Sequence, residues 1–149
     1  GYLFVMGRTD DVINVAGHRF STGEMEEVVA SHSAIAECAV IGIHDPLRGQ
    51  VPIAMVIVKD GIASEIINRI PREIIALVRE KIGAVAYLKQ ALVVKRLPKT
   101  RSGKILRNVL RQLADGENFR PPSTIDDPEA LTEMEKIFKD YKVGYYQSP

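Results

Sequence analysis

Near the N-terminus, apolar side chains recur at every second position, which is the spacing of side chains on one face of a strand. Tyr2, Phe4 and Met6 would share one face of a first strand, and residues 12–15 would form a second strand. The polar residues 8–11 between them have the composition of a turn. The pattern therefore predicts an N-terminal β-hairpin.

Four later segments place apolar residues at the spacing of a buried helical stripe. The first helix is expected to begin after Ser21, which forms a capping-box pattern with Glu24. The second helix has Pro71 at its expected start and Gly83 at its expected end. The last helix lies in the C-terminal tail and is expected to pack on the surface. The second to fourth helices are expected over residues 72–82, 105–113 and 129–141.

Three apolar runs, rich in β-branched residues, have the length of strands. They cover residues 37–43, 52–58 and 91–94, and turn residues separate the first two, which are expected to pair. The order is therefore hairpin, helix, strand, strand, helix, strand, helix. This order favours a small α/β (α+β) domain, with a mixed sheet of about three strands flanked by helices and preceded by the hairpin.

Composition limits the class of protein. The chain has 149 residues, of which 46% are apolar, and this suits one compact domain with a tail and disfavours wholesale disorder. A single cysteine excludes a disulfide framework and suits a reducing compartment. No apolar run is long enough to span a bilayer. Gly1 in place of Met, with no leader after it, indicates a piece of a longer protein.

The formal net charge of +1 hides two unlike parts. Residues 1–114 carry a net charge of +5, and residues 115–149 carry −4. Residues 95–111 contain seven basic side chains and no acidic one, which favours an anionic partner, although a solvated basic face is the simpler interpretation. A stand-alone module that binds nucleic acid or another anion is an alternative. It is disfavoured because the run offers no aromatic side chain for stacking bases.

Residues 7–19 and 98–105 hold more glycine and charge than folding requires. In the first segment, arginines could bind a phosphate as a fork, and Gly17 would let a ligand approach the backbone. In the second, Lys104 stands on a glycine-bearing loop where a helix is expected to begin, a place that favours anions. The P-loop pattern is incomplete, since Ile105 follows the lysine. The alternatives are an exposed hairpin with ion pairs and a solvated basic loop.

The remaining reactive side chains show no pattern for chemistry. The three histidines, at positions 18, 32 and 44, lack the spacing of metal ligands. Cys38 lies in an apolar strand and is interpreted as an inert core residue. Arg79 by itself is typical of a helix surface.

Taken together, residues 7–19 and 98–105 resemble the C-terminal domain of an acyl-CoA synthetase of the adenylate-forming superfamily. The similarity is strongest to the short-chain acetyl- and propionyl-CoA synthetases, and it also includes residues 122–128. The resemblance implies two steps, in which a carboxylic acid and ATP form an acyl-adenylate and pyrophosphate, and CoA then displaces AMP. An alternative is the same domain of another adenylate-forming ligase with a different acid or thiol acceptor.

The resemblance also implies how the chain is organised. Residues 1–114 would be a small mobile domain that rotates between the half-reactions about a hinge near Asp10. Residues 115–149 would be an acidic tail with a helix. A large N-terminal domain, absent from this chain, would hold most of the nucleotide and acid pockets, so the chain would not be active alone.

Site residues follow by matching positions to the family. Lys104 matches the catalytic lysine of adenylation, which is also the family's usual site of inhibitory acetylation. Arg8 matches an arginine at the nucleotide ribose, and Arg19 matches one at the nucleotide phosphate. Arg79 matches an arginine at the CoA 3′-phosphate. The loop that lines the CoA tunnel matches Ala16, Gly17 and His18. A cation site made of backbone carbonyls matches Ala30, His32 and Ile35.

The cofactors implied are ATP, CoA and Mg²⁺, with the ion held mostly by the absent domain. The partners implied are the chain's own N-terminal domain, a small carboxylic acid such as propionate or acetate, and a lysine acetyltransferase and deacetylase acting on Lys104. Neither nucleic acid nor a membrane is expected. Cysteine usage and the resemblance together indicate the cytoplasm, or the mitochondrial matrix in a eukaryote.

Overall fold

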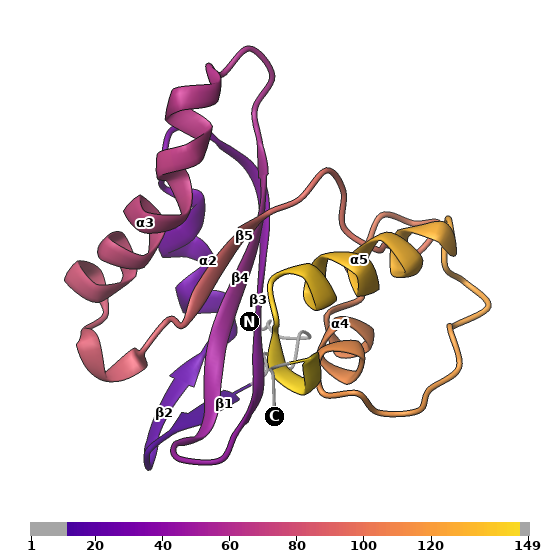
Figure 1. Ribbon diagram of the computed structural model, residues 1–149, viewed down its shortest axis with the longest axis horizontal. Coiled ribbons are helices and arrows are strands. Elements are labelled where there is room, and N and C mark those ends of the chain that lie inside the picture. The colour runs from indigo at the N-terminus through magenta and orange to yellow at the C-terminus, as the bar shows by residue number, and fades with distance from the viewer. Residues whose placement is uncertain (1–11, 147–149) are drawn as a thin grey trace, which may run out of the picture.

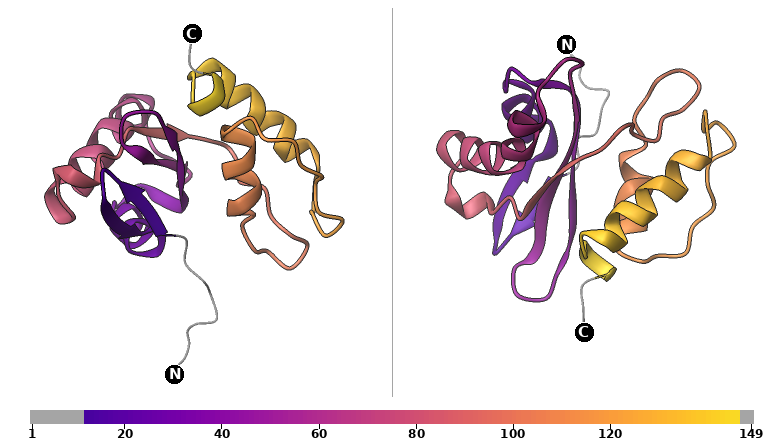
Figure 2. Two further views of the ribbon diagram at one scale, coloured as in Figure 1. Left: turned by 90° about the horizontal axis from the view of Figure 1, so that it is seen from below. Right: turned by 45° about the horizontal axis from the view of Figure 1, so that its top comes forward.

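One five-stranded sheet separates two layers of helices in the computed structural model, which describes residues 12–146 (Figure 1). Helices α2 (Thr22–Ala30) and α3 (Ser64–Lys81) cover one face of the sheet. Helices α4 (Arg107–Ala114) and α5 (Glu129–Asp140) cover the other face, and the two further views in Figure 2 show the same division. Two short 3₁₀ helices complete the fold, η1 (Ala84–Ala86) and η2 (Gly144–Tyr146).

The sheet is mixed, as the sequence predicts. Its strands are β1 (Val12–Val15), β2 (His18–Ser21), β3 (Ile35–Asp45), β4 (Gly49–Val58) and β5 (Gln90–Val93). They follow the order β2-β1-β4-β3, and β5 pairs with β4 on the side away from β3. The β4–β5 pair is parallel, and the other pairs among the described strands are antiparallel. The N-terminal hairpin is continuous with the three expected strands because Val15 of β1 pairs with Gly49 of β4.

Strands β3 and β4 are buried on both faces. Val40 and Val56 belong to the core beneath α2 and α3, whereas Ile41 and Met55 belong to the core beneath α4 and α5. A strand that is buried on both faces needs apolar residues at successive positions. This requirement explains why both strands appear in the sequence as nearly continuous apolar runs.

Helix α5 belongs to the core, although the sequence predicted a helix packed on the surface. Its Met134 and Phe138 are buried in one cluster with Leu110 of α4 and Ile43 of β3. Burial of a side chain of this size contributes about 2 kcal/mol to folding. The tail therefore completes the cover on the second face of the sheet.

Helix α3 begins at Ser64, eight residues before the predicted start at residue 72, and Pro71 lies inside it. A proline inside a helix removes one backbone hydrogen bond and costs about 3 kcal/mol. Burial of Ile70 and Ile74 on either side of Pro71 offsets that cost. Within residues 12–146, no helix is long and apolar enough to cross a bilayer.

The described hairpin, β1–β2, turns at Ala16 and Gly17 and so lies one strand later than the hairpin predicted over residues 2–15. Both residues have positive φ, 51° and 88°, as the central residues of a type I′ turn require. Val12–Val15 and His18–Ser21 pair across this turn. The predicted strand at residues 2–6 and the predicted turn at residues 8–11 lie outside the described residues. Ser21 caps α2 as expected, because its Oγ accepts a hydrogen bond from the Glu24 amide at 3.3 Å.

A bidentate ion pair joins the two helix layers across the edge of the sheet. Arg107, at the start of α4, donates from Nε to Oε2 of Glu26 at 2.6 Å and from Nη2 to Oε1 at 2.7 Å. Glu26 Oε2 also accepts the backbone N–H of Val40 at 3.0 Å, so the same carboxylate covers part of the open edge of β3. Farther along β3, Asp115 Oδ1 accepts the N–H of His44 at 3.0 Å.

The Glu26→Gln substitution is expected to lower the free energy of unfolding by about 3 kcal/mol, because it removes the negative charge that binds the mostly buried guanidinium of Arg107. The side chains of Arg107 and Glu26 are only 19% and 11% exposed. Urea denaturation checks this value. Glu117→Gln, which breaks a more exposed pair with Arg111, is the control and should cost less than about 1 kcal/mol. Equal losses in the two variants would contradict the structural importance of the Glu26–Arg107 pair.

Candidate functional site

The segment that carries Lys104 forms a small closed hairpin. Lys99 and Ile105 pair as an antiparallel bridge at its base. The Thr100 N–H donates to the Lys104 carbonyl at 2.8 Å, and the Gly103 N–H donates to the Thr100 carbonyl at 2.9 Å. These bonds fix the backbone of Lys104, so its side chain projects from a defined position.

A hydroxyl group closes the hairpin from inside. Oγ1 of Thr100 accepts the N–H of Lys104 at 3.1 Å and lies 2.9 Å from Oγ of Ser102. The tip turns at Gly103, whose φ of +94° is unfavourable for other residues. The Thr-x-Ser-Gly pattern of residues 100–103 is therefore the local reason that this loop closes.

The side chain of Lys104 is exposed and makes no hydrogen bond or ion pair with any other residue in the range 12–146. Helix α4 begins at Arg107, although the sequence predicted a helix from residue 105, directly after Lys104. Ile105 pairs with Lys99 as a strand residue, and this extended conformation delays the helix. Lys104 therefore offers a mobile positive charge at the tip of a hairpin rather than at a helix terminus.

The hairpin turn and Arg79, the candidate CoA-binding residues, lie near one another. The Ala16 N–H donates to the Arg48 carbonyl at 2.8 Å, and the Arg48 guanidinium lies 3.8 Å from the ring centroid of Tyr87. Tyr87 in turn lines a cleft of about 140 Å³ together with Arg79 and Gly83. Arg48 and Tyr87 thus connect the turn to the cleft, and β2 also contacts η1.

Sequence reasoning did not single out Arg48 or Tyr87. The Arg-Gly pair of residues 48–49 predicts a turn, but it does not predict that Arg48 contacts a distant aromatic side chain. Tyr87 has a positive φ of 51°, a conformation that the sequence alone does not predict.

The two regions lie at different ends of the molecule. Figure 1 shows the β1–β2 hairpin and the segment after α3 at the lower left, and the segment between β5 and α4 at the upper right beside the start of α5. The structure therefore does not bring the Lys104 loop together with the hairpin turn. The two regions are therefore separate surfaces of this domain.

The other predicted site residues have the following positions. Arg19 is exposed on β2 and pairs with Asn14 across the hairpin. His18 is exposed, and its ring centroid lies 6.4 Å from that of Phe20. Arg8 and Asp10 lie outside the described residues.

The candidate carbonyl ligands for a cation, Ala30, His32 and Ile35, lie along the turn between α2 and β3. The His32 carbonyl already accepts the N–H of Ile35 at 3.1 Å. The His32 ring is also engaged, since Nδ1 accepts the Ala34 N–H and Nε2 lies 2.7 Å from Oε1 of Glu73. Within residues 12–146, no group of three or more His, Cys, Asp or Glu side chains could hold a metal ion.

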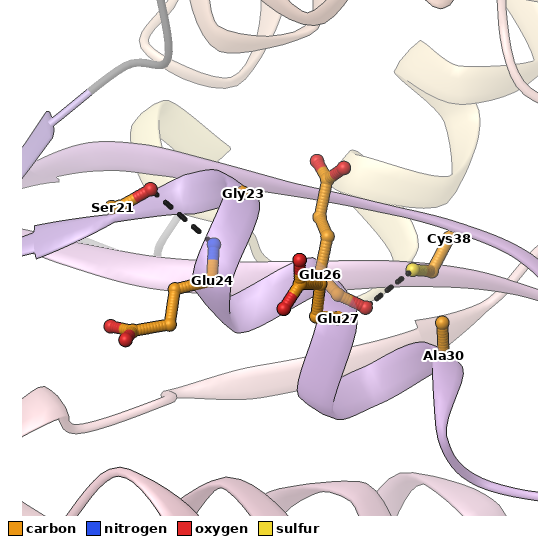
Figure 3. A pocket seen from close by; sticks show the side chains of 7 residues that line it. All are labelled: Ser21, Gly23, Glu24, Glu26, Glu27, Ala30 and Cys38. Carbon is orange, nitrogen blue, oxygen red and sulfur yellow. Dashed lines mark hydrogen bonds between the residues drawn. The ribbon is translucent and has the colours of Figure 1, made fainter. Parts of the chain in front are cut away.

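A hollow of about 730 Å³ lies beside α2 (Figure 3). Three carboxylates line it, those of Glu24, Glu26 and Glu27, and they would repel a phosphate group. Burial and the charge of Glu26 raise the pKa of the Cys38 thiol, also in this hollow, to about 11. The thiol is therefore protonated and unreactive at neutral pH, which agrees with the interpretation of Cys38 as inert.

Comparison with known proteins identifies similar chains. The family model of the AMP-binding enzyme C-terminal domain matches residues 24–104. Over 97% of its length the chain is 61% identical to a Pseudomonas aeruginosa protein with no assigned activity, of which it spans 23%. Over 97% of its length it is also 48% identical to the mitochondrial acyl-CoA synthetase short-chain family member B of Dictyostelium discoideum, of which it spans 21%.

Among solved structures, the Brucella canis acyl-CoA synthetase matches with a TM-score of 0.61 and 38% identity, over 72% of this chain and 19% of that one. The chain spans about a fifth of the length of the relatives that it matches.

Proposed function

Because the chain belongs to the AMP-binding enzyme C-terminal domain family, we propose that it is the mobile domain of an ATP-dependent short-chain acyl-CoA synthetase. The parent enzyme would convert a small acid such as propionate or acetate, ATP and CoA into acyl-CoA, AMP and pyrophosphate. The observation that carries the proposal is the exposed side chain of Lys104, which has no partner among residues 12–146, at the tip of a hydrogen-bonded hairpin.

Lys104 would act in the adenylation step. A carboxylate oxygen attacks the α-phosphorus of ATP, and the bond to pyrophosphate breaks. Both reactants are anions, so a positioned ammonium that contacts the acid and the α-phosphate lowers their repulsion and stabilises the charge that builds up in the transition state. Acetylation of Lys104 by an acetyltransferase would remove that charge, and a deacetylase would restore it.

The hairpin turn and Arg79 would act in the thioester-forming step. The CoA thiolate attacks the acyl carbon of the acyl-adenylate, and AMP leaves. At Gly17 no side chain limits the approach of CoA, and the Arg79 guanidinium suits the CoA 3′-phosphate. Since the segment between β5 and α4, which carries Lys104, lies at a different end of the molecule from the β1–β2 hairpin, the domain would rotate between the steps, with Asp10 as the proposed hinge.

The remaining assignments complete the proposal. Arg8 would contact the ribose of the nucleotide, Arg19 its phosphate, and the main chain of Ala16 and His18 would line the CoA tunnel. Residues 1–114 would form the mobile domain and residues 115–149 its tail. The large N-terminal domain of the parent enzyme would be its partner and would hold most of the ligands of the ATP-bound Mg²⁺.

A second cation would lie at the carbonyls of Ala30, His32 and Ile35. The compartment would be the cytoplasm, or the mitochondrial matrix in a eukaryote, and a bacterial relative and a mitochondrial one are both compatible with this assignment.

In the complete synthetase that carries this domain, Lys104→Ala is expected to lower acid-dependent ATP–pyrophosphate exchange by about 100-fold or more, because the charge that stabilises the transition state is lost. Formation of the thioester from supplied acyl-adenylate and CoA should remain at the level of the unsubstituted enzyme. Equal loss of both half-reactions would contradict the assigned role.

Gly103→Ala tests whether the backbone shape of the Lys104 hairpin matters for the reaction. Gly61→Ala, which introduces a similar backbone strain elsewhere, is the control. Gly103 and Gly61 have similar φ, +94° and +83°, and an added Cβ would meet nothing within 4 Å at either position. Each alanine should therefore cost about 1 kcal/mol of stability through backbone strain alone. Only Gly103→Ala should slow pyrophosphate exchange, by about tenfold, because it displaces Lys104. A matching loss of exchange in Gly61→Ala would contradict a local effect.

Arg79→Ala is expected to raise the KM for CoA by about tenfold, since a charge-assisted phosphate contact is lost. With dephospho-CoA, which lacks the 3′-phosphate, the variant and the unsubstituted enzyme should have the same KM. Arg72→Ala, on an exposed position two turns earlier in α3, is the control and should leave both values unchanged. A tenfold effect that persists with dephospho-CoA would place Arg79 away from the 3′-phosphate.

A further inference from the structure

We infer that residues 124–133 of the tail form a brace for the Lys104 hairpin, and that Arg96 and Ile125 are positioning residues for the adenylation step. The inference rests on the role of Lys104 proposed above. It gives a function to a part of the chain that the family model, which ends at residue 104, does not include.

The brace pairs with the hairpin through backbone hydrogen bonds. Thr100 and Ile125 form an antiparallel bridge. The Arg101 N–H donates to the Thr124 carbonyl at 2.9 Å, and the Asp126 N–H donates to the Lys99 carbonyl at 2.8 Å. One arm of the hairpin therefore lies between the other arm and the tail, as the middle of three short extended segments.

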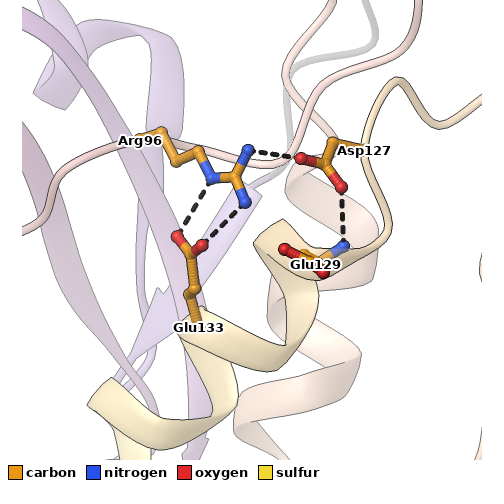
Figure 4. Close-up of polar contacts among 4 residues, drawn as sticks. All are labelled: Arg96, Asp127, Glu129 and Glu133. Carbon is orange, nitrogen blue, oxygen red and sulfur yellow. Dashed lines mark hydrogen bonds and ion pairs between the residues drawn. The ribbon is translucent and has the colours of Figure 1, made fainter.

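Arg96 ties the brace to the chain that enters the hairpin (Figure 4). Its Nε and Nη2 donate to the two carboxylate oxygens of Glu133 at 3.0 and 2.7 Å, and its Nη1 donates to Oδ2 of Asp127 at 2.7 Å. Asp127 Oδ1 accepts the Glu129 N–H at 3.0 Å, which fixes the start of α5. Hydrogen bonds from Arg96 lower the pKa of both carboxyl groups, so both are ionised at neutral pH.

The buried side chain of Ile125 holds the brace against α4 and α5. It is 5% exposed and is buried in one cluster with Val109 of α4 and Leu131 of α5. The two helices beneath the hairpin thus hold the residue that pairs with Thr100. Backbone hydrogen bonds hold Thr124 and Asp126, the buried side chain of Ile125 lies between them, and Arg96 binds the carboxylates farther along the brace.

The brace sets the position of the Lys104 hairpin relative to the rest of the domain, and it is not needed to close the hairpin. The hairpin closes through its own bonds between Thr100 and Lys104, and Lys99 Nζ lies 2.7 Å from Oε1 of Glu37 on β3. Those contacts leave the tip, at residues 101–104, able to pivot about its base. The bonds from Arg101 to Thr124 and from Asp126 to Lys99 oppose this pivot, and a shift of about 1 Å in a catalytic group can cost 100-fold in rate.

The first test uses the 149-residue chain and amide hydrogen exchange by NMR. Arg96→Ala and Ile125→Ala should each accelerate exchange of the Arg101 and Asp126 amides by about three- to tenfold, the effect of losing one net hydrogen bond. Arg111→Ala, which removes the ion pairs of an arginine of α4 with Asp115 and Glu117, is the control and should leave both amides unchanged. Unchanged exchange in both brace variants would overturn the inference.

The second test separates positioning from stability in the complete synthetase. Ile125→Ala and Arg96→Ala should lower kcat for pyrophosphate exchange by about tenfold and leave thioester formation from acyl-adenylate unchanged. Ile125→Val, which keeps most of the buried contact, should restore exchange to within about twofold. An equal loss of both half-reactions would show a merely structural role and overturn the inference.

The Lys104→Ala variant, measured alongside, distinguishes the two proposals. If Lys104→Ala abolishes exchange while the brace variants retain it, the brace is refuted and the function of Lys104 stands. If Lys104→Ala itself retains exchange, the proposed function fails.

Discussion

The bidentate pair between Glu26 and Arg107 is the constraint on which the arrangement of the two helix layers depends. It is the point where α2, on one face of the sheet, is joined directly to α4, on the other. Two mostly buried charges repay their desolvation only when geometry and additional hydrogen bonds are good, and here the Val40 N–H supplies a further bond. Because Arg107 comes three residues after Lys104, the pair also fixes where the Lys104 hairpin returns to the body of the domain.

From this fixed point, the fold places two chemically different surfaces far apart. The hairpin turn and Arg79 lie on the side of α2 and α3, and the Lys104 hairpin lies on the side of α4 and α5. Different supports hold the two surfaces. A strained turn connected through Arg48 and Tyr87 holds the first, and backbone pairing with the tail holds the second. A change in one support need not alter the other, so the two half-reactions proposed for the parent enzyme could be perturbed separately.

The sequence predicted those elements whose cause is local or periodic. The helix after Ser21 follows from its cap, and β3 and β4 follow from apolar runs, because burial on two faces leaves a strong signal. The predicted start of α3 was wrong. Proline favours the first turn of a helix, but the burial of Ile70 and Ile74 keeps Pro71 inside α3. In that case tertiary packing outweighed a local rule.

The candidate site was less accessible from sequence. The family resemblance is confirmed, but spacing alone left the Lys104 segment open to interpretation as a solvated basic loop. This segment pairs with Thr124 and Asp126 through backbone atoms that every residue possesses. No pattern of side chains in the sequence therefore predicts the pairing. The contact between Arg48 and Tyr87 joins residues in different turns, and only the fold brings them together.

The position of α5 decides where a self-sufficient folding unit can end. A fragment cut at residue 104, where the family match stops, would lose both α4 and α5 and leave Ile41, Ile43 and Met55 facing water. Three large apolar side chains on neighbouring strands would form an exposed apolar patch, which promotes aggregation. Expression boundaries for this domain, and for similar domains in larger enzymes, should therefore extend at least to Val143, the last residue buried in that core.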